Sequence, residues 1–304
     1  MQAVRFGEYG GVDVLDVVEV PVPEPGAGEA LVQVKAAGIN PGEAKIRQGL
    51  LHSRWPATFP SGEGSDLAGI VTKAGNGAVG FAAGDEVIGY TDVRASQAEY
   101  VVVPAEHLTS RPAGVPWEVA GSLYVAGCTA WAAVRAVSAG PGDTVVVAGA
   151  AGGVGSITVQ LARLAGAIVI GLASEAHHDW LRSKDIIPVT YGDGVADRIR
   201  AAALRTDAFI DTFGAGYVQL ALDLGISPDR IDTIANFAAV GEYGVKAEGN
   251  AAGASASTLA ELAGLVAVGR LEVPIAATFP LQAVRDAYRL LEQGHTRGKI
   301  VLVP

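Results

Sequence analysis

The part of the chain with the clearest chemical potential is the glycine-rich loop at residues 149–155, Gly-Ala-Ala-Gly-Gly-Val-Gly. Glycine has no Cβ, so backbone N–H groups in such a turn can approach a pyrophosphate, and a helix starting behind the turn adds partial positive charge. The loop follows the β-branched run Thr144–Ala148 and leads into a helical pattern. Counted strictly, the motif is Ala150-x-Gly152-x-x-Gly155, with Ala in place of the first Gly. This context predicts a dinucleotide site, and the competing interpretation is a tight turn in an apolar α/β domain.

The end of the next strand bears on the choice of nicotinamide cofactor. Sites that prefer NAD place Asp or Glu there to bind the ribose hydroxyls. Here Ala173 stands at that position, and Ser174 after it can donate to a 2′-phosphate. Glu175 favours NAD instead, but an acidic residue there also suits the first turn of a helix. Basic or titratable residues follow within a helical turn or two: His177, His178, Arg182 and Lys184. NADPH is therefore the predicted cofactor, although a plain surface helix would also explain the two histidines.

Composition argues against several other kinds of function. The net charge of −10 and the absence of a Lys/Arg cluster argue against a nucleic-acid partner. The single cysteine, Cys128, excludes an intramolecular disulfide, is expected to be a buried small hydrophobe and is compatible with a cytoplasmic location. Residues 144–162 carry no charge, but four glycines inside them favour strand, loop and helix over a membrane span. No H-E-x-x-H, Cys-x-x-Cys or G-x-S-x-G motif supports a metalloprotease or serine hydrolase.

The elements around the glycine loop alternate between strand and helix, which predicts βαβ units and a parallel sheet. The predicted strands are Thr144–Ala148, Ala167–Leu172, Ile187–Thr190, Ala208–Asp211 and Arg230–Ala235. The predicted helices between them are Gly153–Ala165, Ala176–Ser183, Ala196–Leu204 and Gly216–Leu224. Before this region, Pro116–Val137 has the apolar spacing of one helix. The small-residue stretch Ala251–Thr258 is expected to be a loop.

The first part of the chain is predicted to be β-rich instead. Its valine-rich runs are Ala30–Ala37, Ala68–Ala74, Glu86–Tyr90 and Glu99–Val103. Asn40-Pro41 marks a helix start, with Asn as N-cap and Pro at the first helical position. After Gly269 come a strand (Val273–Phe279), a helix (Leu281 to about Gln293) and a last strand (Lys299–Val303) that can return to the β-rich part. We therefore expect one domain from residues 1–116 and 271–304, and a second from residues 117–270.

Several motifs in a fixed order resemble a known family. They are Ala37–Pro41 (AGINP), Pro60–Gly69 (PSGEGSDLAG), Gly84–Val87 (GDEV), Ala98–Pro104 (AEYVVVP), Gly127–Trp131 (GCTAW), the glycine loop and Gly298–Val301 (GKIV). The chain resembles the zinc-independent quinone oxidoreductases of the medium-chain dehydrogenase/reductase superfamily, which includes zeta-crystallin and the enoyl-reductase modules of polyketide synthases. The resemblance implies an α/β protein with a GroES-like β-rich domain and a Rossmann doubly wound parallel-sheet domain.

The resemblance also implies roles for individual residues. Asn40 and Thr129 would lie near the nicotinamide, and Gly152, Gly153 and Val154 would face the pyrophosphate. The residues implied for the adenosine phosphate and for the remaining border of the cofactor are Ser174, Tyr191, Phe213 and Asn236.

Two comparisons with relatives concern the substrate pocket and a metal site. Lys45 stands where these reductases usually have Tyr, so the substrate pocket is expected to be more polar. Relatives that oxidise alcohols hold a catalytic zinc, but Asn40 and Ser65 occupy the positions of its first two ligands. We therefore expect no metal site.

The expected function is metal-free hydride transfer from NADPH to an electron-poor acceptor, a quinone or an α,β-unsaturated carbonyl, with Asn40 and Lys45 on the catalytic side. Two alternatives remain: a dedicated enoyl reductase of a biosynthetic pathway, or an NADPH-binding protein without turnover, such as a sensor or a crystallin. The expected partners are a small electrophilic substrate and a second copy in a homodimer, with neither nucleic acid nor membrane involved.

Overall fold

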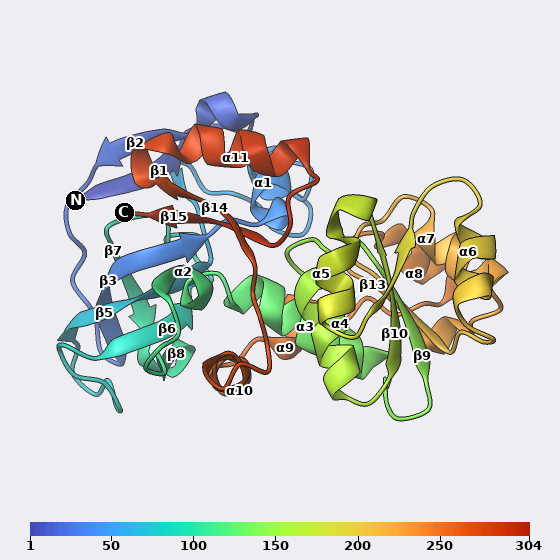
Figure 1. Cartoon of the computed structure of the whole chain (residues 1–304). Helices are drawn as coiled ribbons and strands as arrows, with labels where there is room; N and C mark the ends of the chain where they lie inside the picture. Colours follow the sequence, from blue (N-terminus) through green and yellow to red (C-terminus); the bar gives the residue numbers. More distant parts are fainter. The chain divides into compact units, whose positions relative to one another are not determined.

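The computed structural model describes all 304 residues, which form two compact units (Figure 1). The first unit combines Met1–Val125 with Ser255–Pro304, and the second is Ala126–Ala254. These limits lie nine residues after the expected boundary at 116 and sixteen residues before the expected boundary at 270. The reason is packing: helix α2 (Trp117–Ala120) lies against strands β3 and β5, and helix α10 (Ala256–Ala267) lies against β6 and β8 of the first unit.

The first unit is built on two sheets. The larger one has the strand order β14-β15-β3-β5-β6-β8, with β7 also paired to β3, and the smaller has the order β2-β1-β4. Its strands are β1 (Gln2–Phe6), β2 (Asp16–Glu19), β3 (Glu29–Gly38), β4 (Ser61–Gly62), β5 (Asp66–Ala74), β6 (Glu86–Tyr90), β7 (Tyr100–Pro104), β8 (Leu108–Ser110), β14 (Ile275–Pro280) and β15 (Lys299–Val303). The valine-rich runs thus form β3, β5, β6 and β7, as predicted.

The last strand returns to the first domain, as the sequence predicted. β15 runs antiparallel to β3, pairing Val301 with Gly38 and Leu302 with Ala37. Helix α11 (Val284–Gln293) covers this region and buries Val284, Ala287 and Tyr288, which the three- and four-residue spacing places on one face. Figure 1 shows the red C-terminal elements beside the blue N-terminal strands. This return is what brings the residues near 40 and near 299 together.

Helix α1 (Pro41–Arg47) begins where the sequence predicted. Asn40 is its N-cap, with extended backbone angles, and Pro41 is its first residue. Glu43, three residues after the cap, accepts the backbone N–H of Asn40 at 2.8 Å through Oε2. That contact ties the start of the helix to a buried carboxylate.

The second unit holds one parallel sheet of five strands in the order β11-β10-β9-β12-β13. Its strands are β9 (Thr144–Ala148), β10 (Ile168–Ala173), β11 (Ile187–Thr190), β12 (Ala208–Asp211) and β13 (Ile231–Thr233). Its helices are α4 (Gly155–Leu164), α5 (His178–Ser183), α6 (Val195–Ala202), α7 (Tyr217–Asp223), α8 (Ala238–Tyr243) and α9 (Asn250–Gly253), and α3 (Tyr124–Ala136) leads into the unit. This is the doubly wound arrangement that the alternating pattern predicted.

Two local predictions were wrong. The apolar stretch Pro116–Val137 is broken between α2 and α3 at Gly121, whose carbonyl accepts the Gly38 N–H at 2.6 Å and whose missing Cβ leaves room for the Ala36 carbonyl oxygen. The close approach of β3 thus ends the helix there. The stretch Ala251–Thr258 is mostly helical, and the Ser255 hydroxyl accepts the Thr258 N–H at 3.0 Å to cap α10.

The uncharged run at residues 144–162 divides into β9, the glycine loop and most of α4, as predicted. Every helix of the structure is too short or too polar to cross a bilayer.

Candidate functional site

The glycine loop connects β9 to α4 and leaves backbone donors available. Ala150 N–H donates to Leu172 O at 3.0 Å, and Gly152 N–H to Gly149 O at 2.9 Å, which fixes the turn. The N–H groups of Gly153 and Val154 find no acceptor within the chain. Two N–H groups at the start of a ten-residue helix form a ready anion site.

One glycine of this loop is required by packing. A Cβ at Gly155 would lie 2.1 Å from the Gly149 carbonyl oxygen, so only glycine lets the helix begin this close to the strand end. Ala150, which replaces the first Gly of the motif, is fully buried and keeps its backbone bond to β10. The departure from the motif therefore leaves the turn intact.

The predicted adenosine-phosphate residues follow neighbouring strands. In the register of β10 and β11, Ala173 pairs with Thr190, so Ser174 and Tyr191 leave the sheet side by side. Tyr191 is 39% exposed and Ser174 is half-buried. Ala173 is buried at the strand end, and Glu175 is exposed in the turn after it. No carboxylate thus stands at the last position of β10, which is where NAD-preferring sites place one.

A buried carboxylate that sequence reasoning missed organises the other side of the same edge. Asp211, the last residue of β12, accepts the N–H groups of Phe213 and Gly214 at 3.0 and 2.7 Å and the Thr233 hydroxyl at 2.8 Å. Burial raises the pKa of Asp211, and these hydrogen bonds oppose the rise. Thr233 in turn accepts the Asn236 N–H at 3.0 Å, so both predicted cofactor residues, Phe213 and Asn236, sit on loops held by this pair.

The residues predicted for the cofactor in the second unit therefore share one edge of the sheet, since all but Thr129 follow the carboxyl ends of parallel strands. The strand order reverses between β9 and β12, and open α/β sheets bind ligands at such a switch point. Phe213 is 65% exposed at this edge, whereas Thr129 is buried on α3.

The first unit contains a cluster of buried polar side chains centred on Asn40, which is 3% exposed. Both hydrogens of its amide are engaged: Nδ2 donates to Glu43 Oε1 at 3.2 Å and to Asp66 Oδ2 at 3.1 Å. Its Oδ1 accepts a hydrogen bond from the Lys299 ammonium. Asn40 is the helix N-cap that the sequence predicted, but its amide has no hydrogen left for a ligand.

Lys299 completes the cluster, and sequence reasoning assigned it no role. Besides Asn40 Oδ1, its ammonium contacts Ile39 O at 3.1 Å and Asp66 Oδ2 at 3.4 Å. Asp66 is fully buried and also accepts the Val125 N–H at 2.6 Å. The one available sequence signal was a charged residue at the start of each apolar strand: Lys299 opens β15 and Asp66 opens β5.

Glu43 joins the cluster to helix α11. It accepts the Ser65 N–H at 3.0 Å and the Tyr288 hydroxyl at 3.2 Å, and Tyr288 accepts from Gln97 at 2.8 Å. Burial, with a smaller contribution from the charge of Asp66, raises the pKa of Glu43 to about 7. The carboxyl group is therefore poised to change protonation near neutral pH, inside the protein rather than at its surface.

A second buried ion pair lies next to Glu43. Arg47 Nη1 is 3.5 Å from Glu63 Oε1, with both side chains fully buried, and Arg47 Nη2 reaches Glu292 at 2.7 Å. The guanidinium also lies 4.6 Å from the centre of the Tyr288 ring. Burial raises the pKa of Glu63 well above its ordinary value, and the charge of Arg47 opposes that rise.

Lys45, predicted as a catalytic residue, is not part of this cluster. It lies on α1 between the buried Ala44 and the half-buried Ile46, but its own side chain is exposed and has no partner within the chain. Its assignment to the substrate side stays a prediction.

The cluster does not fit a zinc ion. The resemblance assigns Asn40 and Ser65 to the first two zinc-ligand positions, and the structure contains no group of three or more His, Cys, Asp or Glu side chains that could hold a metal ion. The Lys299 ammonium already occupies the place between Asn40 Oδ1, Asp66 Oδ2 and Ile39 O. A divalent cation there would meet a positive charge, so no chemical step is assigned to a metal.

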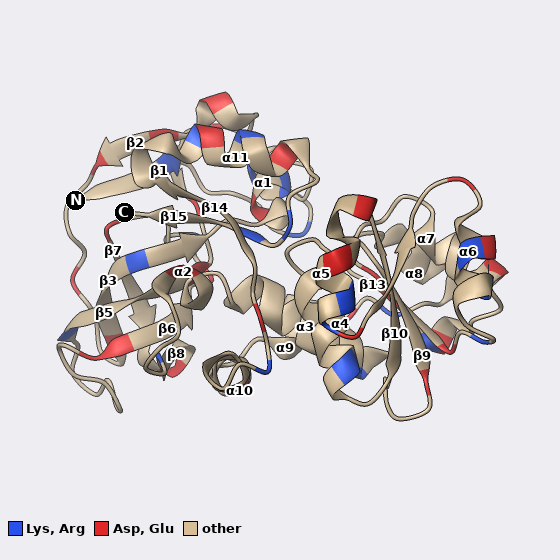
Figure 2. Ribbon diagram, in the orientation of Figure 1, with Lys and Arg blue, Asp and Glu red and all other residues tan.

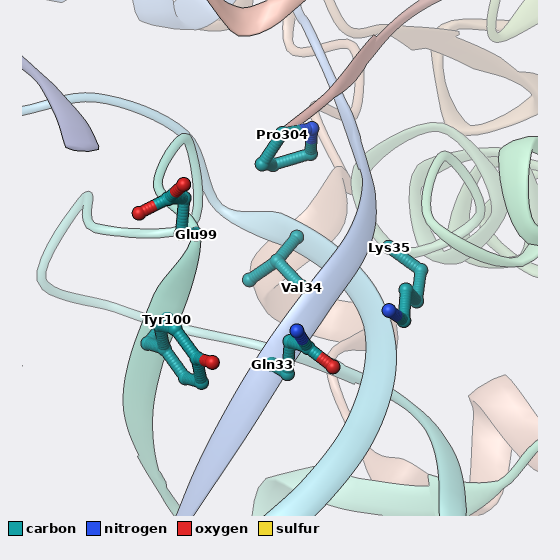
Figure 3. Close-up of a pocket in the computed structure, with 6 residues that line it drawn as sticks. All are labelled: Gln33, Val34, Lys35, Glu99, Tyr100 and Pro304. Atoms are coloured by element: carbon teal, nitrogen blue, oxygen red, sulfur yellow. The ribbon is translucent and has the colours of Figure 1, made fainter. Parts of the chain in front are cut away.

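A pocket of about 220 Å³ lies elsewhere on the first unit, over β3 and β7 (Figure 3). It is lined by Gln33, Val34, Lys35, Glu99, Tyr100 and Pro304. None of the residues predicted for the cofactor or the substrate lines it, and it has no part in the chemistry considered above.

Comparison with known protein families gives two matches, in the order of the domains. Residues 26–113 match the alcohol dehydrogenase GroES-like domain, and residues 192–302 match a model described as zinc-binding dehydrogenase. The chloroplast envelope quinone oxidoreductase homolog of Arabidopsis thaliana is 28% identical over 100% of this chain and 98% of that protein. The mouse quinone oxidoreductase is 37% identical over 57% of this chain, and that alignment spans 52% of the mouse protein.

Solved structures agree over the full length. The Escherichia coli quinone oxidoreductase complexed with NADPH is 25% identical, with a TM-score of 0.88 and full coverage of both chains. An NAD-dependent alcohol dehydrogenase is 29% identical, with a TM-score of 0.89 and full coverage of both chains. The fold is a GroES-like domain joined to a Rossmann-like parallel sheet. The chain therefore belongs to the medium-chain dehydrogenase/reductase superfamily of oxidoreductases and is quinone oxidoreductase-like within it.

Proposed function

We propose that this protein transfers a hydride from NADPH to a quinone or an α,β-unsaturated carbonyl without a metal ion. The observation that carries the proposal is the edge of the parallel sheet. There, the unengaged N–H groups of Gly153 and Val154 lie at a helix start, and β10 ends in Ala173 instead of a carboxylate. The Escherichia coli quinone oxidoreductase named above, which was crystallised with NADPH, supports the same cofactor class.

The cofactor would be held along this edge. Gly152, Gly153 and Val154 would bind the pyrophosphate, and Ser174 and Tyr191 the adenosine phosphate. When bound, the nicotinamide supplies the hydride, while the protein aligns the partners and excludes water.

The saturated contacts of Asn40 refine its role. An amide that gives both hydrogens to Glu43 and Asp66 cannot also donate to a substrate oxygen without losing a buried hydrogen bond. We therefore propose that the Asn40 side chain is held in a fixed position in the active site and does not itself donate a hydrogen bond to the substrate. The donor to a developing enolate would then be Lys45, or a ribose hydroxyl through water.

The proposal that no metal takes part rests on Lys299. Its ammonium contacts the Ile39 carbonyl, the amide oxygen of Asn40 and the Asp66 carboxylate, and Asn40 is the residue at the first zinc-ligand position. A cytoplasmic location is supported by the single buried cysteine, which suits a reducing compartment. A homodimer remains the expected assembly, and sedimentation equilibrium would check it.

The test is a screen of NADPH oxidation against quinones, enones and simple ketones, with NADH in parallel. We expect turnover with quinones or enones and NADPH, and little with unactivated ketones. Tight NADPH binding without turnover of any acceptor would favour the non-catalytic alternative. Oxidation of alcohols that depends on added zinc would overturn the proposal.

A further inference from the structure

The loop after β11 is held by a single arginine. This loop, Tyr191–Gly194, is exposed, and Gly192 and Gly194 adopt left-handed backbone angles with φ of +94° and +73°. Arg198, one turn into α6, donates to four consecutive carbonyl groups. Its Nε reaches Thr190 O at 2.9 Å, Nη1 reaches Asp193 O at 2.8 Å, and Nη2 reaches Tyr191 O and Gly192 O at 3.2 Å each.

This arrangement uses a property of arginine. The guanidinium is a planar fork of five N–H donors, so it can bond to several carbonyls spread over a loop, whereas lysine offers three donors around one point. The contacts of Arg198 fix the backbone on both sides of Tyr191, since Thr190 and Gly192 are both held. The direction in which the Tyr191 ring leaves the sheet thus depends on Arg198.

The charge of Arg198 also differs from that of the arginines around it. Arg182 is paired with Asp179 at 2.8 Å, and Arg200 with Asp197 at 3.2 Å. All four bonds of Arg198 go to neutral carbonyls. Figure 2 shows basic and acidic residues together on α6, where Arg198 and Arg200 lie. Of these three cations, only Arg198 is not neutralised by a carboxylate.

This charge lies next to Tyr191, one of the two residues predicted for the adenosine phosphate. Tyr191 follows β11 directly beside Ser174, which follows β10, and Ala173 provides no carboxylate to repel a phosphate. We propose that Arg198 is a positioning residue for the 2′-phosphate end of NADPH: it fixes Tyr191 and adds an unneutralised positive charge beneath the loop. This inference rests on the proposed function, because it specifies how the second unit distinguishes NADPH from NADH.

The experiment compares dissociation constants for NADPH and NADH, and for the fragment 2′,5′-ADP, in the parent protein and in three variants. Arg198→Ala should weaken the binding of NADPH and of 2′,5′-ADP about tenfold, because the variant loses both the nearby positive charge and the fixed position of Tyr191, and should weaken NADH binding no more than about threefold. Arg198→Lys keeps the charge but cannot hold four carbonyls. In this variant the ratio of the dissociation constant for NADH to that for NADPH should fall about threefold. Arg200→Ala, two residues away on the same helix, is the matched control and should behave like the parent.

Melting curves and circular dichroism separate recognition from folding. If Arg198→Ala does not fold, Arg198→Lys carries the test, and a cofactor ratio equal to the parent's overturns the inference. Equal weakening of both cofactors by folded Arg198→Ala overturns it too, because the role would then be structural. A parent that binds NADH as tightly as NADPH would instead contradict the proposed function, and no variant is needed to see that.

Discussion

Lys299 lies beside Asn40 because β15 pairs antiparallel with β3, and its ammonium donates to the Asn40 amide oxygen and to Asp66. The two residues are separated by 259 positions in the chain. The same contact fixes the amide of Asn40, pairs a buried carboxylate with a cation and places a positive charge beside Asn40, the residue that the resemblance assigns to the first zinc-ligand position. Each consequence can be measured.

Replacing Lys299 with Met should destabilise the protein strongly. The Lys299 side chain is 3% exposed and the Asp66 side chain is fully buried, so the variant leaves a buried carboxylate without its cation. Breaking such a buried pair costs about 3–5 kcal/mol. Denaturant unfolding of parent and variant measures the difference. Lys45→Ala, an exposed lysine without a partner, is the matched control and should change stability by less than about 0.5 kcal/mol. If Lys299→Met loses no more stability than Lys45→Ala, the stabilising role of the Lys299–Asp66 pair is contradicted.

Glu43 should make the protein less stable as pH rises toward neutrality. Its folded pKa is raised from 4.5 to about 7, so between these values the folded state holds a proton that the unfolded state releases. The stabilisation contributed by the Glu43 carboxyl group is therefore fully present below pH ~4.5 and is lost as the pH rises through ~7. The free energy of unfolding falls by about 3 kcal/mol in total over this range. Subtracting the unfolding free energies of Glu43→Gln from those of the parent between pH 5 and 8 isolates the effect. A difference that stays flat with pH, or rises, would show that burial does not raise the pKa of Glu43.

Ala173→Asp should narrow or reverse the preference for NADPH. The new carboxylate would stand at the end of β10 beside Ser174, where it can bind ribose hydroxyls but repels a 2′-phosphate. We expect NADPH to bind at least about tenfold more weakly and NADH to bind as well or better. Fluorescence titration with both cofactors measures this. Ala173→Asn, similar in size but uncharged, is the control, and an equal effect of both substitutions would point to steric disturbance.

Lys45→Ala should lower turnover without changing NADPH affinity, because the pyrophosphate site at Gly153 and Val154 is in the other unit. A contact made mainly in the transition state lowers kcat and kcat/KM together. The drop in turnover should reach about tenfold for enones, which build negative charge on one oxygen, and be smaller for quinones, whose negative charge is spread over the ring. Steady-state kinetics with both classes test this, with melting curves as the control. If every acceptor is reduced at the parent rate, Lys45 is an ordinary surface lysine.

The purified protein should contain no stoichiometric zinc. Asn40 and Ser65 offer an amide and a hydroxyl where a soft metal needs thiolate or imidazole, and Lys299 holds the space between the oxygens. Elemental analysis before and after treatment with a chelator measures this, together with activity. One zinc per chain, removed by the chelator along with activity, would refute the metal-free proposal.

Local chemistry made much of the fold predictable from the sequence. The run from Thr144 through the glycines to the helix defines β9, the loop and α4, because strand and helix periods and the need for Gly155 are local properties. The alternation of strand and helix patterns after the glycine loop predicted the parallel sheet. The sequence also predicted that the residues proposed for the cofactor follow those strands and share one edge of the sheet, since carboxyl ends of parallel strands meet at one edge. Where the prediction failed, as at Gly121, the cause was a neighbouring strand that no local pattern reveals.

Only the tertiary structure decided which charges are buried and paired. Asn40, Asp66 and Lys299 lie in three separate segments, and the return of β15 to β3 makes them one cluster. The sequence therefore predicted Asn40 as the N-cap of α1 but could not show that its amide hydrogens are already engaged. Arg198 looks in the sequence like any other arginine of a surface helix, and only the folded loop aligns four carbonyl groups on it. Periodicity and turn chemistry act between near neighbours, whereas the energy of a buried charge depends on what the whole fold packs around it.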